Sequence, residues 1–158
     1  MLKDSGERRE FETGAVRDIQ EGKGRCDLLP LDVVNQILDT NKTELKTIEL
    51  FKKTGDHVHL MVALNEFMSS RYSSIEGAML ELSKHFEEGA IKYGENNWKK
   101  GIPVHCYIDS AVRHYLKWLK CDEDEPHDRA FMWNLICAIW TCENFSQLKI
   151  IRGGRYGN

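Results

Sequence analysis

The sequence predicts an all-α fold, a helical bundle of four or more helices with an extended N-terminal arm. Apolar residues recur three and four positions apart in successive segments between residues 31 and 148, which is the spacing of one buried helical face. No segment shows the sustained alternation of apolar and polar residues that would indicate a strand. With 158 residues, the chain is long enough to bury one proper core.

Capping and breaking residues set the expected ends of these helices. A serine before a helix can accept a hydrogen bond from the first turn, as Ser73 or Ser74 would. Proline suits a first turn because its missing N–H has no partner there, which places Pro126 at the start of the last long helix. The expected helices cover 31–53 in two pieces with a break near 40–42, 57–72, from Ser73 or Ser74 to Gly94, about 107–120, and 126 to about 148.

The two ends of the chain differ in composition from the helical part, residues 27–148. Residues 1–26 are polar, rich in glycine and charged with both signs, so we expect an extended or flexible arm. Residues 149–158 are expected to form a flexible tail. If the arm docks where it meets the first helix, it would bring Lys23 and Arg25 over a site, and a solvated tail is the alternative.

Composition excludes several classes of function. The net charge of −3, with both signs mixed, argues against nucleic-acid binding, because phosphate backbones favour a clear basic excess. The most apolar run, 131–140, is too short to span a membrane. The first residues lack an apolar signal-peptide core, so we expect a cytoplasmic protein whose five cysteines are free thiols. None of them forms a C-x-x-C pair, which argues against a zinc site built on thiolates.

One group of candidate site residues lies on the helix that ends at Gly94. His85 and Glu88 follow Glu81 at four and seven positions, so the three side chains stack on one ridge of the helix. Because two acids and an imidazole share this ridge, it could hold a cation.

The end of the same helix offers residues for nucleotide binding. Lys92 would contact a phosphate, and Tyr93 or Trp98 would stack on a base. The structural alternative is that Trp98 fills the core and that Asn97 satisfies the backbone of the turn.

A second group lies at the start of the last long helix. Glu125 and Asp128 form an E-x-x-D on adjacent turns of one face, which suits a hard cation such as Mg²⁺ or Mn²⁺. Acids at a helix start are also common because they complement the helix dipole. His127 is offset from both acids, toward another wall of the same cleft or toward solvent. Asn134, further along, would orient a substrate or a metal-bound water, or fill the core.

The helix between these two groups carries Arg113 and His114. An ion pair of Arg113 with Asp109, four residues earlier, is an ordinary structural explanation for this cation. His85, His114 and His127 come from three successive helices that short loops should make neighbours. If the helix faces converge, the imidazoles and the acids beside them would form a mixed nitrogen and oxygen metal site or an acid/base cluster.

Four blocks of the sequence resemble a known family. The blocks are GKGRCDLLP (22–30), HFEEGAIKYGENNWKKG (85–101), DSAVRHYLKW (109–118) and EDEPHDRAFMWN (123–134). They resemble, in the same order, the phage and bacterial family labelled dATP/dGTP diphosphohydrolase, N-terminal domain, with a helical insertion at 31–74. Within these blocks the G-A-x-K-Y-G-x-x-N-W motif is specific.

The resemblance implies an all-α, metal-dependent nucleotide pyrophosphohydrolase. Such an enzyme would cleave a purine (deoxy)nucleoside triphosphate to monophosphate and pyrophosphate, in phage nucleotide-pool control and in the host cytoplasm if the chain is phage-encoded. The broader MazG-type enzymes hold Mg²⁺ with an E-x-x-E on one helix and an E-x-x-D on the next. Glu125 and Asp128 match the second motif, whereas Glu81, Glu87 and Glu88 do not give a clean first one. A homo-oligomer, dimer or tetramer, is also implied.

A mechanism follows from the resemblance as a hypothesis. One or two Mg²⁺ or Mn²⁺ ions between the two acidic ridges would bridge the phosphates and activate a water, while cations neutralise the developing charge and a histidine moves the proton. A protein that captures a nucleotide, or a nucleotide-like signal, without cleaving it would use the same cationic and aromatic residues. A structural protein with packed histidines is a third possibility. The candidates are His114, His127, Lys92 and Arg113 for catalysis, Lys23, Arg25, Tyr93, Asn97, Trp98 and Asn134 for substrate, and Glu81, His85, Glu88, Glu125 and Asp128 for metal.

Overall fold

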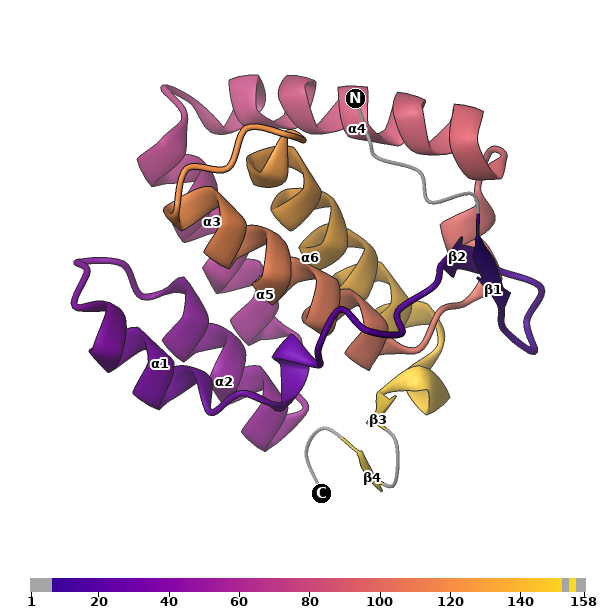
Figure 1. The fold of residues 1–158 in the computed structure, drawn as a ribbon, viewed down its shortest axis with the longest axis horizontal. Helices are drawn as coiled ribbons and strands as arrows, with labels where there is room; N and C mark the ends of the chain where they lie inside the picture. The colour runs from indigo at the N-terminus through magenta and orange to yellow at the C-terminus, as the bar shows by residue number, and fades with distance from the viewer. Residues whose placement is uncertain (1–6, 152–153, 156–158) are drawn as a thin grey trace.

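Six α-helices pack together in the computed structural model, which describes residues 7–151, 154 and 155. The all-α prediction is confirmed, and a small two-stranded hairpin precedes the helices (Figure 1). The helices are α1 (Leu31–Leu38), α2 (Glu44–Thr54), α3 (Val58–Arg71), α4 (Ile75–Tyr93), α5 (Val104–Leu119) and α6 (His127–Asn144).

The helix ends follow the local signals in most places. Ser74 caps α4, since its hydroxyl oxygen accepts a hydrogen bond from the Gly77 N–H at 2.9 Å. The break between α1 and α2 also falls where the apolar spacing fails. Two ends differ from the prediction: α5 begins at Val104 rather than near residue 107, and α6 ends at Asn144, before a separate 3₁₀ turn at Ser146–Leu148.

The core lies around α5 and α6, which run side by side in the centre of the molecule, with α3 against α6 and α2 against α3 (Figure 1). Phe67, Tyr115 and Phe131 are fully buried where α3, α5 and α6 meet. The ring of Phe131 lies 4.7 Å from that of Phe67 and 4.9 Å from that of Tyr115, centroid to centroid. Tilted aromatic contacts of this kind add to the stabilisation from buried area, so the two central helices form a rigid support.

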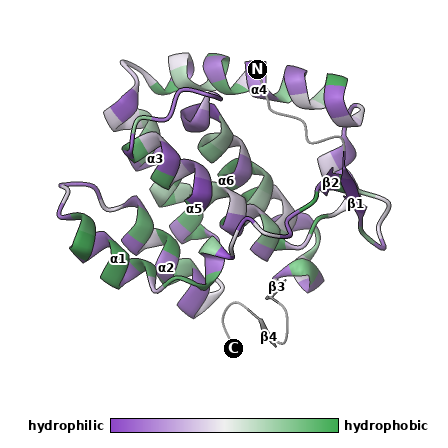
Figure 2. Ribbon diagram, viewed as in Figure 1, coloured by the Kyte–Doolittle hydropathy of each residue, from purple (hydrophilic) through white to green (hydrophobic). Residues whose placement is uncertain are grey.

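Helix α4 lies across one side of this core. Hydrophobic and hydrophilic residues alternate along it (Figure 2), as one-sided packing requires. Ala78, Leu82 and His85 are its buried residues, whereas Leu80 and Ile91 face outward. The buried ridge of α4 therefore points His85 toward α6 and the centre of the molecule.

The N-terminal arm contains a short antiparallel hairpin that the periodicity of the sequence did not predict. β1 (Arg8–Glu10) pairs with β2 (Val16–Asp18), and Arg9 stands directly opposite Arg17. Gly14, between the strands, has a φ of 87°, a left-handed conformation that favours glycine. The hairpin lies beside the C-terminal end of α4 (Figure 1), so the arm folds back onto the helices.

The C-terminal end contains a second pair of short strands. β3 (Ile150–Ile151) pairs antiparallel with β4 (Gly154–Arg155). Residues 152–153 and 156–158 of the expected flexible tail, and residues 1–6 of the expected arm, lie outside the described residues. Within the described part of the chain, no helix has both the length and the apolar character needed to cross a membrane.

Candidate functional site

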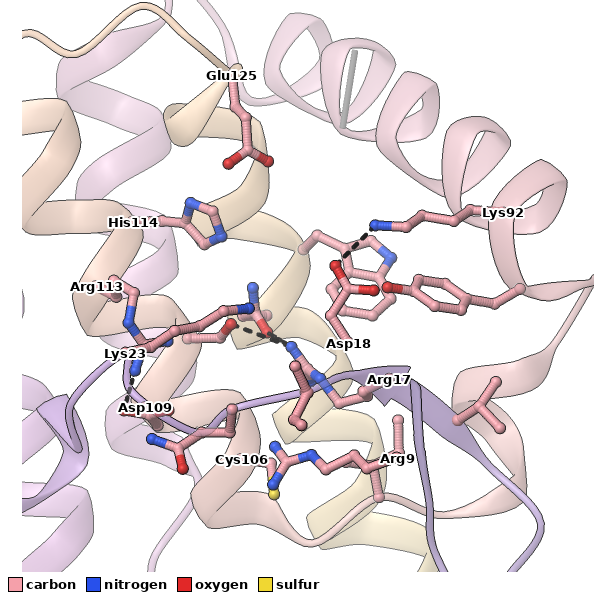
Figure 3. A pocket seen from close by; sticks show the side chains of 18 of the residues that line it. Arg9, Arg17, Asp18, Lys23, Lys92, Cys106, Asp109, Arg113, His114 and Glu125 are labelled. Carbon is pink, nitrogen blue, oxygen red and sulfur yellow. Dashed lines mark hydrogen bonds and ion pairs between the residues drawn. The ribbon is translucent and has the colours of Figure 1, made fainter. Parts of the chain in front are cut away.

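A pocket of about 620 Å³ lies between the N-terminal hairpin, α4, α5 and the start of α6 (Figure 3). Its volume is within the range of small-molecule sites in proteins. The residues that line it are Arg9, Val16, Arg17, Asp18, Ile19, Gln20 and Lys23 from the arm, His85, Lys92, Tyr93, Asn97 and Ile102 from α4 and the following turn, Cys106, Asp109, Ser110, Arg113, His114 and Lys117 from α5, and Glu125, Trp133 and Asn134 from the last loop and α6.

Asn97 fastens the hairpin to the helices. Its buried side-chain amide accepts a hydrogen bond from the Val16 N–H at 2.9 Å and donates one to the Val16 carbonyl at 2.8 Å. The amide thereby pairs with β2 as the backbone of a neighbouring strand would. The hydroxyl of Thr13 donates a further hydrogen bond to the carbonyl of Gly101. These contacts set the position of Arg17, the residue that follows Val16.

Arg17 extends from β2 toward α5 and α6. Its Nη2 donates hydrogen bonds to Ser110 Oγ at 3.1 Å and to Asn134 Oδ1 at 3.2 Å. The guanidinium carbon lies 5.2 Å from the ring centroid of Tyr107 and 5.8 Å from that of Trp133. All these partners are neutral, and Nη1 is buried without a hydrogen-bond partner among the described residues. Arg17 therefore retains unsatisfied donor capacity at the pocket.

Lys92 connects α4 to the hairpin. Its Nζ lies 3.0 Å from Asp18 Oδ2, and Arg8 contacts the other oxygen of the same carboxylate at 2.9 Å. Burial alone would lower the pKa of Lys92, but hydrogen bonds to Asp18 and Tyr93 outweigh it and raise the pKa above its ordinary value. Burial also raises the pKa of the Tyr93 hydroxyl. At neutral pH Lys92 is therefore charged and Tyr93 is protonated.

Asp109 and Arg113 form the ion pair that their spacing suggested, with Nη2 of Arg113 at 2.7 Å from Oδ1 of Asp109. The same carboxylate oxygen accepts a hydrogen bond from the Cys26 N–H at 2.7 Å, and Arg113 also donates to the Gly24 carbonyl at 2.8 Å. These bonds tie the loop that carries Lys23 to α5, and Lys23 extends into the pocket (Figure 3). Burial lowers the pKa of Lys23.

Positive charge is concentrated in the pocket, although the chain as a whole has a net charge of −3. Among the described lining residues, six are lysine or arginine and three are aspartate or glutamate. Two of the carboxylates, Asp18 and Asp109, are already engaged by Lys92 and Arg113. A partly enclosed site with such an excess attracts anions. The cations are Arg9, Arg17, Lys23, Lys92, Arg113 and Lys117.

His114 and His127 face each other across α5 and α6, with their Nδ1 atoms 2.9 Å apart. On its other side, Nε2 of His127 lies 2.7 Å from Oδ1 of Asp124. In the neutral tautomer that this carboxylate favours, Nε2 donates to Asp124 and Nδ1 of His127 keeps its lone pair. Burial, followed by the nearby His127, lowers the pKa of His114 well below its ordinary value, so its imidazole is neutral at pH 7.

Two groups of side chains could hold a metal ion at this end of the pocket. His114, Glu125 and His127 each offer one ligand atom, and these atoms lie within 4.8 Å of one another. Asp122 and Asp124 form the second group with His127. The first group reaches the pocket through His114 and Glu125. Figure 3 shows these two residues at one end of the pocket and Arg9 at the opposite end.

His85 reaches the pocket from α4, as the sequence suggested, but it does not join His114 and His127 in either metal group. Its ring lies 5.6 Å from that of Trp133, centroid to centroid. Burial, followed by the charge of Arg129, lowers the pKa of His85 to about 3. Its Nδ1 atom is buried without a hydrogen-bond partner among the described residues. The neutral imidazole can form hydrogen bonds with a ligand but is too weak a base to take up a proton at pH 7.

Three candidate acids lie in ion pairs outside the pocket and outside the metal-capable groups found among the described residues. Each pairs with a neighbouring cation at the surface or between helices. The two positions of the E-x-x-D are therefore separated, because Glu125 reaches the pocket while Asp128 pairs with Arg71 at the end of α3. The ion pairs are Glu81 with Lys84 at 3.0 Å, Glu88 with Arg129 at 3.4 Å, and Asp128 with Arg71 at 3.2 Å.

Two candidate substrate residues also lie outside the pocket lining. Arg25 pairs with the buried Asp27 at 2.7 Å. Trp98 packs between the rings of Phe86 and Trp140, at centroid distances of 5.5 and 5.0 Å. Both side chains therefore contact structural partners and do not line the pocket.

The dATP/dGTP diphosphohydrolase, N-terminal family matches residues 58–149, which is more than half of the chain. The chain belongs to this family. No curated protein and no solved structure matches the chain. The range assigned to this diphosphohydrolase family runs from the start of α3 through the 3₁₀ turn that follows α6, and it includes His85, Lys92, Arg113, His114 and Glu125. The matched range begins inside residues 31–74, the segment that we expected to be a helical insertion. The hairpin and Lys23 lie outside the matched range.

Sequence reasoning missed the pocket residues of the hairpin. Arg9, Arg17 and Asp18 line the pocket but stood in a segment expected to be an extended arm. The one local signal for a hairpin was Thr13-Gly14, a turn pair between two short charged stretches.

Proposed function

We propose that this member of the family hydrolyses purine deoxynucleoside triphosphates to the monophosphate and pyrophosphate with the help of a divalent metal ion. The observation that carries the proposal is one pocket with an excess of cations and, at one end, a group of nitrogen and oxygen ligands. Phosphoryl transfer depends on positioning and on neutralising phosphate charge, and both features serve these needs.

The donor set of His114, Glu125 and His127 fits a divalent metal ion. Imidazole nitrogens favour first-row transition metals, whereas Mg²⁺ prefers a set made of oxygens. The group therefore suits Mn²⁺ better than Mg²⁺. The hydrogen bond between His127 and Asp124 supports this role because it orients the ring and directs the Nδ1 lone pair toward His114. A bound ion would supply phosphate charge neutralisation and a more acidic water.

Three cations of the pocket would hold the phosphates. Lys92 and Arg113 are fixed by Asp18 and Asp109, so they need little rearrangement to act on a bound anion. Lys23 stands on a loop and has no carboxylate within ion-pair distance among the described residues. Its side chain can therefore follow the substrate as it enters. These cations would stabilise the negative charge that develops as pyrophosphate leaves.

The aromatic part of the pocket would receive the base. Tyr93 and Trp133 are pocket-lining rings, and stacking on such faces is tolerant of base identity. His85 Nδ1 and Trp133 Nε1 are both buried without hydrogen-bond partners among the described residues. Two buried polar atoms in these positions would discriminate between polar groups on the base edge, because an unmatched buried polar group is costly.

The proposal is tested by incubating the full chain with a panel of nucleoside triphosphates and either Mn²⁺ or Mg²⁺. Anion-exchange separation should reveal dAMP or dGMP together with pyrophosphate. The variant Glu125→Gln should lose turnover because it removes one metal ligand of the proposed group. Glu123→Gln is the matched control, an exposed carboxylate in the same loop, and should keep turnover. Intact nucleotides that co-elute with the protein would contradict hydrolysis and support capture of the nucleotide without cleavage.

A further inference from the structure

The hairpin places two arginines side by side in the pocket, away from Glu125. Arg9 and Arg17 are directly paired across the two strands, and both line the pocket. Residues paired in this way project from the same face of a hairpin, and like charges in such a pair are destabilising. Burial lowers the pKa of Arg9, and the charge of Arg17 lowers it further.

No described carboxylate lies within ion-pair distance of either arginine. The ion pairs of the described residues include neither Arg9 nor Arg17, whereas the neighbouring Arg8 is paired with Asp18 at 2.9 Å. Arg9 Nε and Arg17 Nη1 are both buried without hydrogen-bond partners among the described residues. Two adjacent guanidinium groups with unsatisfied N–H donors are an arrangement that an anion would stabilise.

We infer that Arg9 and Arg17, with Lys23 beside them, form a binding site for the polyphosphate chain of the substrate. The inference rests on the proposed function for the identity of the ligand, and it adds the hairpin, outside the range matched by the family, to the residues that recognise that ligand. A guanidinium group can bind phosphate oxygens in a bidentate manner, and two such groups side by side match a chain with several anionic groups. The pocket volume of about 620 Å³ leaves room for the nucleoside at the aromatic wall.

The site orients the substrate. Glu125 and His114 lie at one end of the pocket and Arg9 at the other, with Arg17 between them (Figure 3). A triphosphate held by the hairpin would lie with its chain directed along this line. Arg17 is held in place by Ser110 and Asn134, so it needs no large movement to bind.

The experiment is a calorimetric titration of the full chain with inorganic tripolyphosphate in EDTA, which removes any contribution of a metal ion. Wild-type protein should bind. Arg9→Gln and Arg17→Gln should each bind about tenfold more weakly or worse, because each removes charged hydrogen bonds to the anion. Lys53→Gln is the control for net charge, since Lys53 lies on α2 and pairs with Asp32 at the surface. Its affinity should equal that of the wild type.

Two further measurements keep the outcome decisive. Far-UV circular dichroism verifies that Arg17→Gln is folded, and Lys23→Gln, at an exposed position, tests the same site without a risk to the fold. Equal affinity of wild type, Arg9→Gln, Arg17→Gln and Lys23→Gln, or no binding by wild type, would overturn the inference. Hydrolysis of dATP and dGTP is assayed separately. If tripolyphosphate binding depends on the arginines but no nucleotide is hydrolysed, the proposed function is wrong and the anion site stands. If nucleotides are hydrolysed but tripolyphosphate binding does not depend on the arginines, the anion site alone is wrong.

Discussion

Replacing Asn97 by alanine should release the hairpin while leaving the helices folded. The substitution removes the two hydrogen bonds of 2.9 and 2.8 Å that join the Asn97 amide to the backbone of Val16. A buried hydrogen bond contributes about 1 kcal/mol net, so the loss is about 2 kcal/mol, or roughly a 30-fold shift in the docking equilibrium. The bond between Thr13 and Gly101 remains and continues to favour docking.

Hydrogen exchange measured by mass spectrometry tests this reasoning segment by segment. In Asn97→Ala, amides of β1 and β2 should exchange roughly 30-fold faster, and those of α5 and α6 should not change. If the protein is an enzyme of the proposed kind, KM should rise much more than kcat falls, since Asn97 positions the hairpin. Asn144→Ala is the control, because its amide donates a hydrogen bond to the Trp140 carbonyl within the same helix, α6. Unchanged exchange of the hairpin in Asn97→Ala would refute the role of this residue.

Three more predictions concern pH, capping and the metal ion. The pKa of His85 falls to about 3 in the folded state from 6.5, so its contribution to stability is complete above pH 6.5 and declines as the pH falls toward 3. In thermal melts, His85 should make the protein about 2 kcal/mol less stable at pH 5 than at pH 7. The variant His85→Phe should lack this part of the dependence of stability on pH. Ser74→Ala should cost about 1 kcal/mol and lower Tm by roughly 2–4 °C, and an unchanged melt would argue against the cap. Mn²⁺ should support turnover at lower concentration than Mg²⁺, and the opposite order would contradict the proposed ligand set of two histidines and Glu125.

The helices were predictable because local signals specify them. Apolar spacing located all six, and Ser74 and Gly55 stand where a first-turn acceptor and a left-handed C-terminal residue are needed. The extension of α5 back to Val104 was not visible, since His105 and Cys106 gave no clear apolar periodicity there. In the structure Val104 and Cys106 are buried, so packing decided the boundary.

The hairpin was not predictable by the same means. Its strands have three residues each, which is too short for an alternating pattern to stand out from a polar arm. Its position depends on Asn97, 81 residues after Val16, and on the contact of Arg17 with Asn134, 117 residues away. Pairings over such distances leave no periodic trace in a single sequence.

The candidate metal ligands were predicted only in part, because spacing on a helix reports a shared face and says little about what the face meets. Glu81, His85 and Glu88 do share the ridge of α4, yet the two acids reach Lys84 and Arg129 while His85 alone turns into the pocket. The convergence of helices did bring His114 and His127 together, with Nδ1 atoms 2.9 Å apart. That contact follows from the short loop between α5 and α6, which makes them antiparallel neighbours.

Two parts of the chain line the pocket, one inside and one outside the range that the family matches. The matched range, 58–149, contains His114, Glu125 and His127, so the metal-capable group belongs to the family domain. Arg9 and Arg17 come from outside it and add charge to the opposite end and the middle of the pocket. Asn97 lies within the matched range and forms hydrogen bonds with the hairpin, so the family domain carries the residue that holds the hairpin in place. Variation in the hairpin would then alter how tightly an anion binds without changing the metal group.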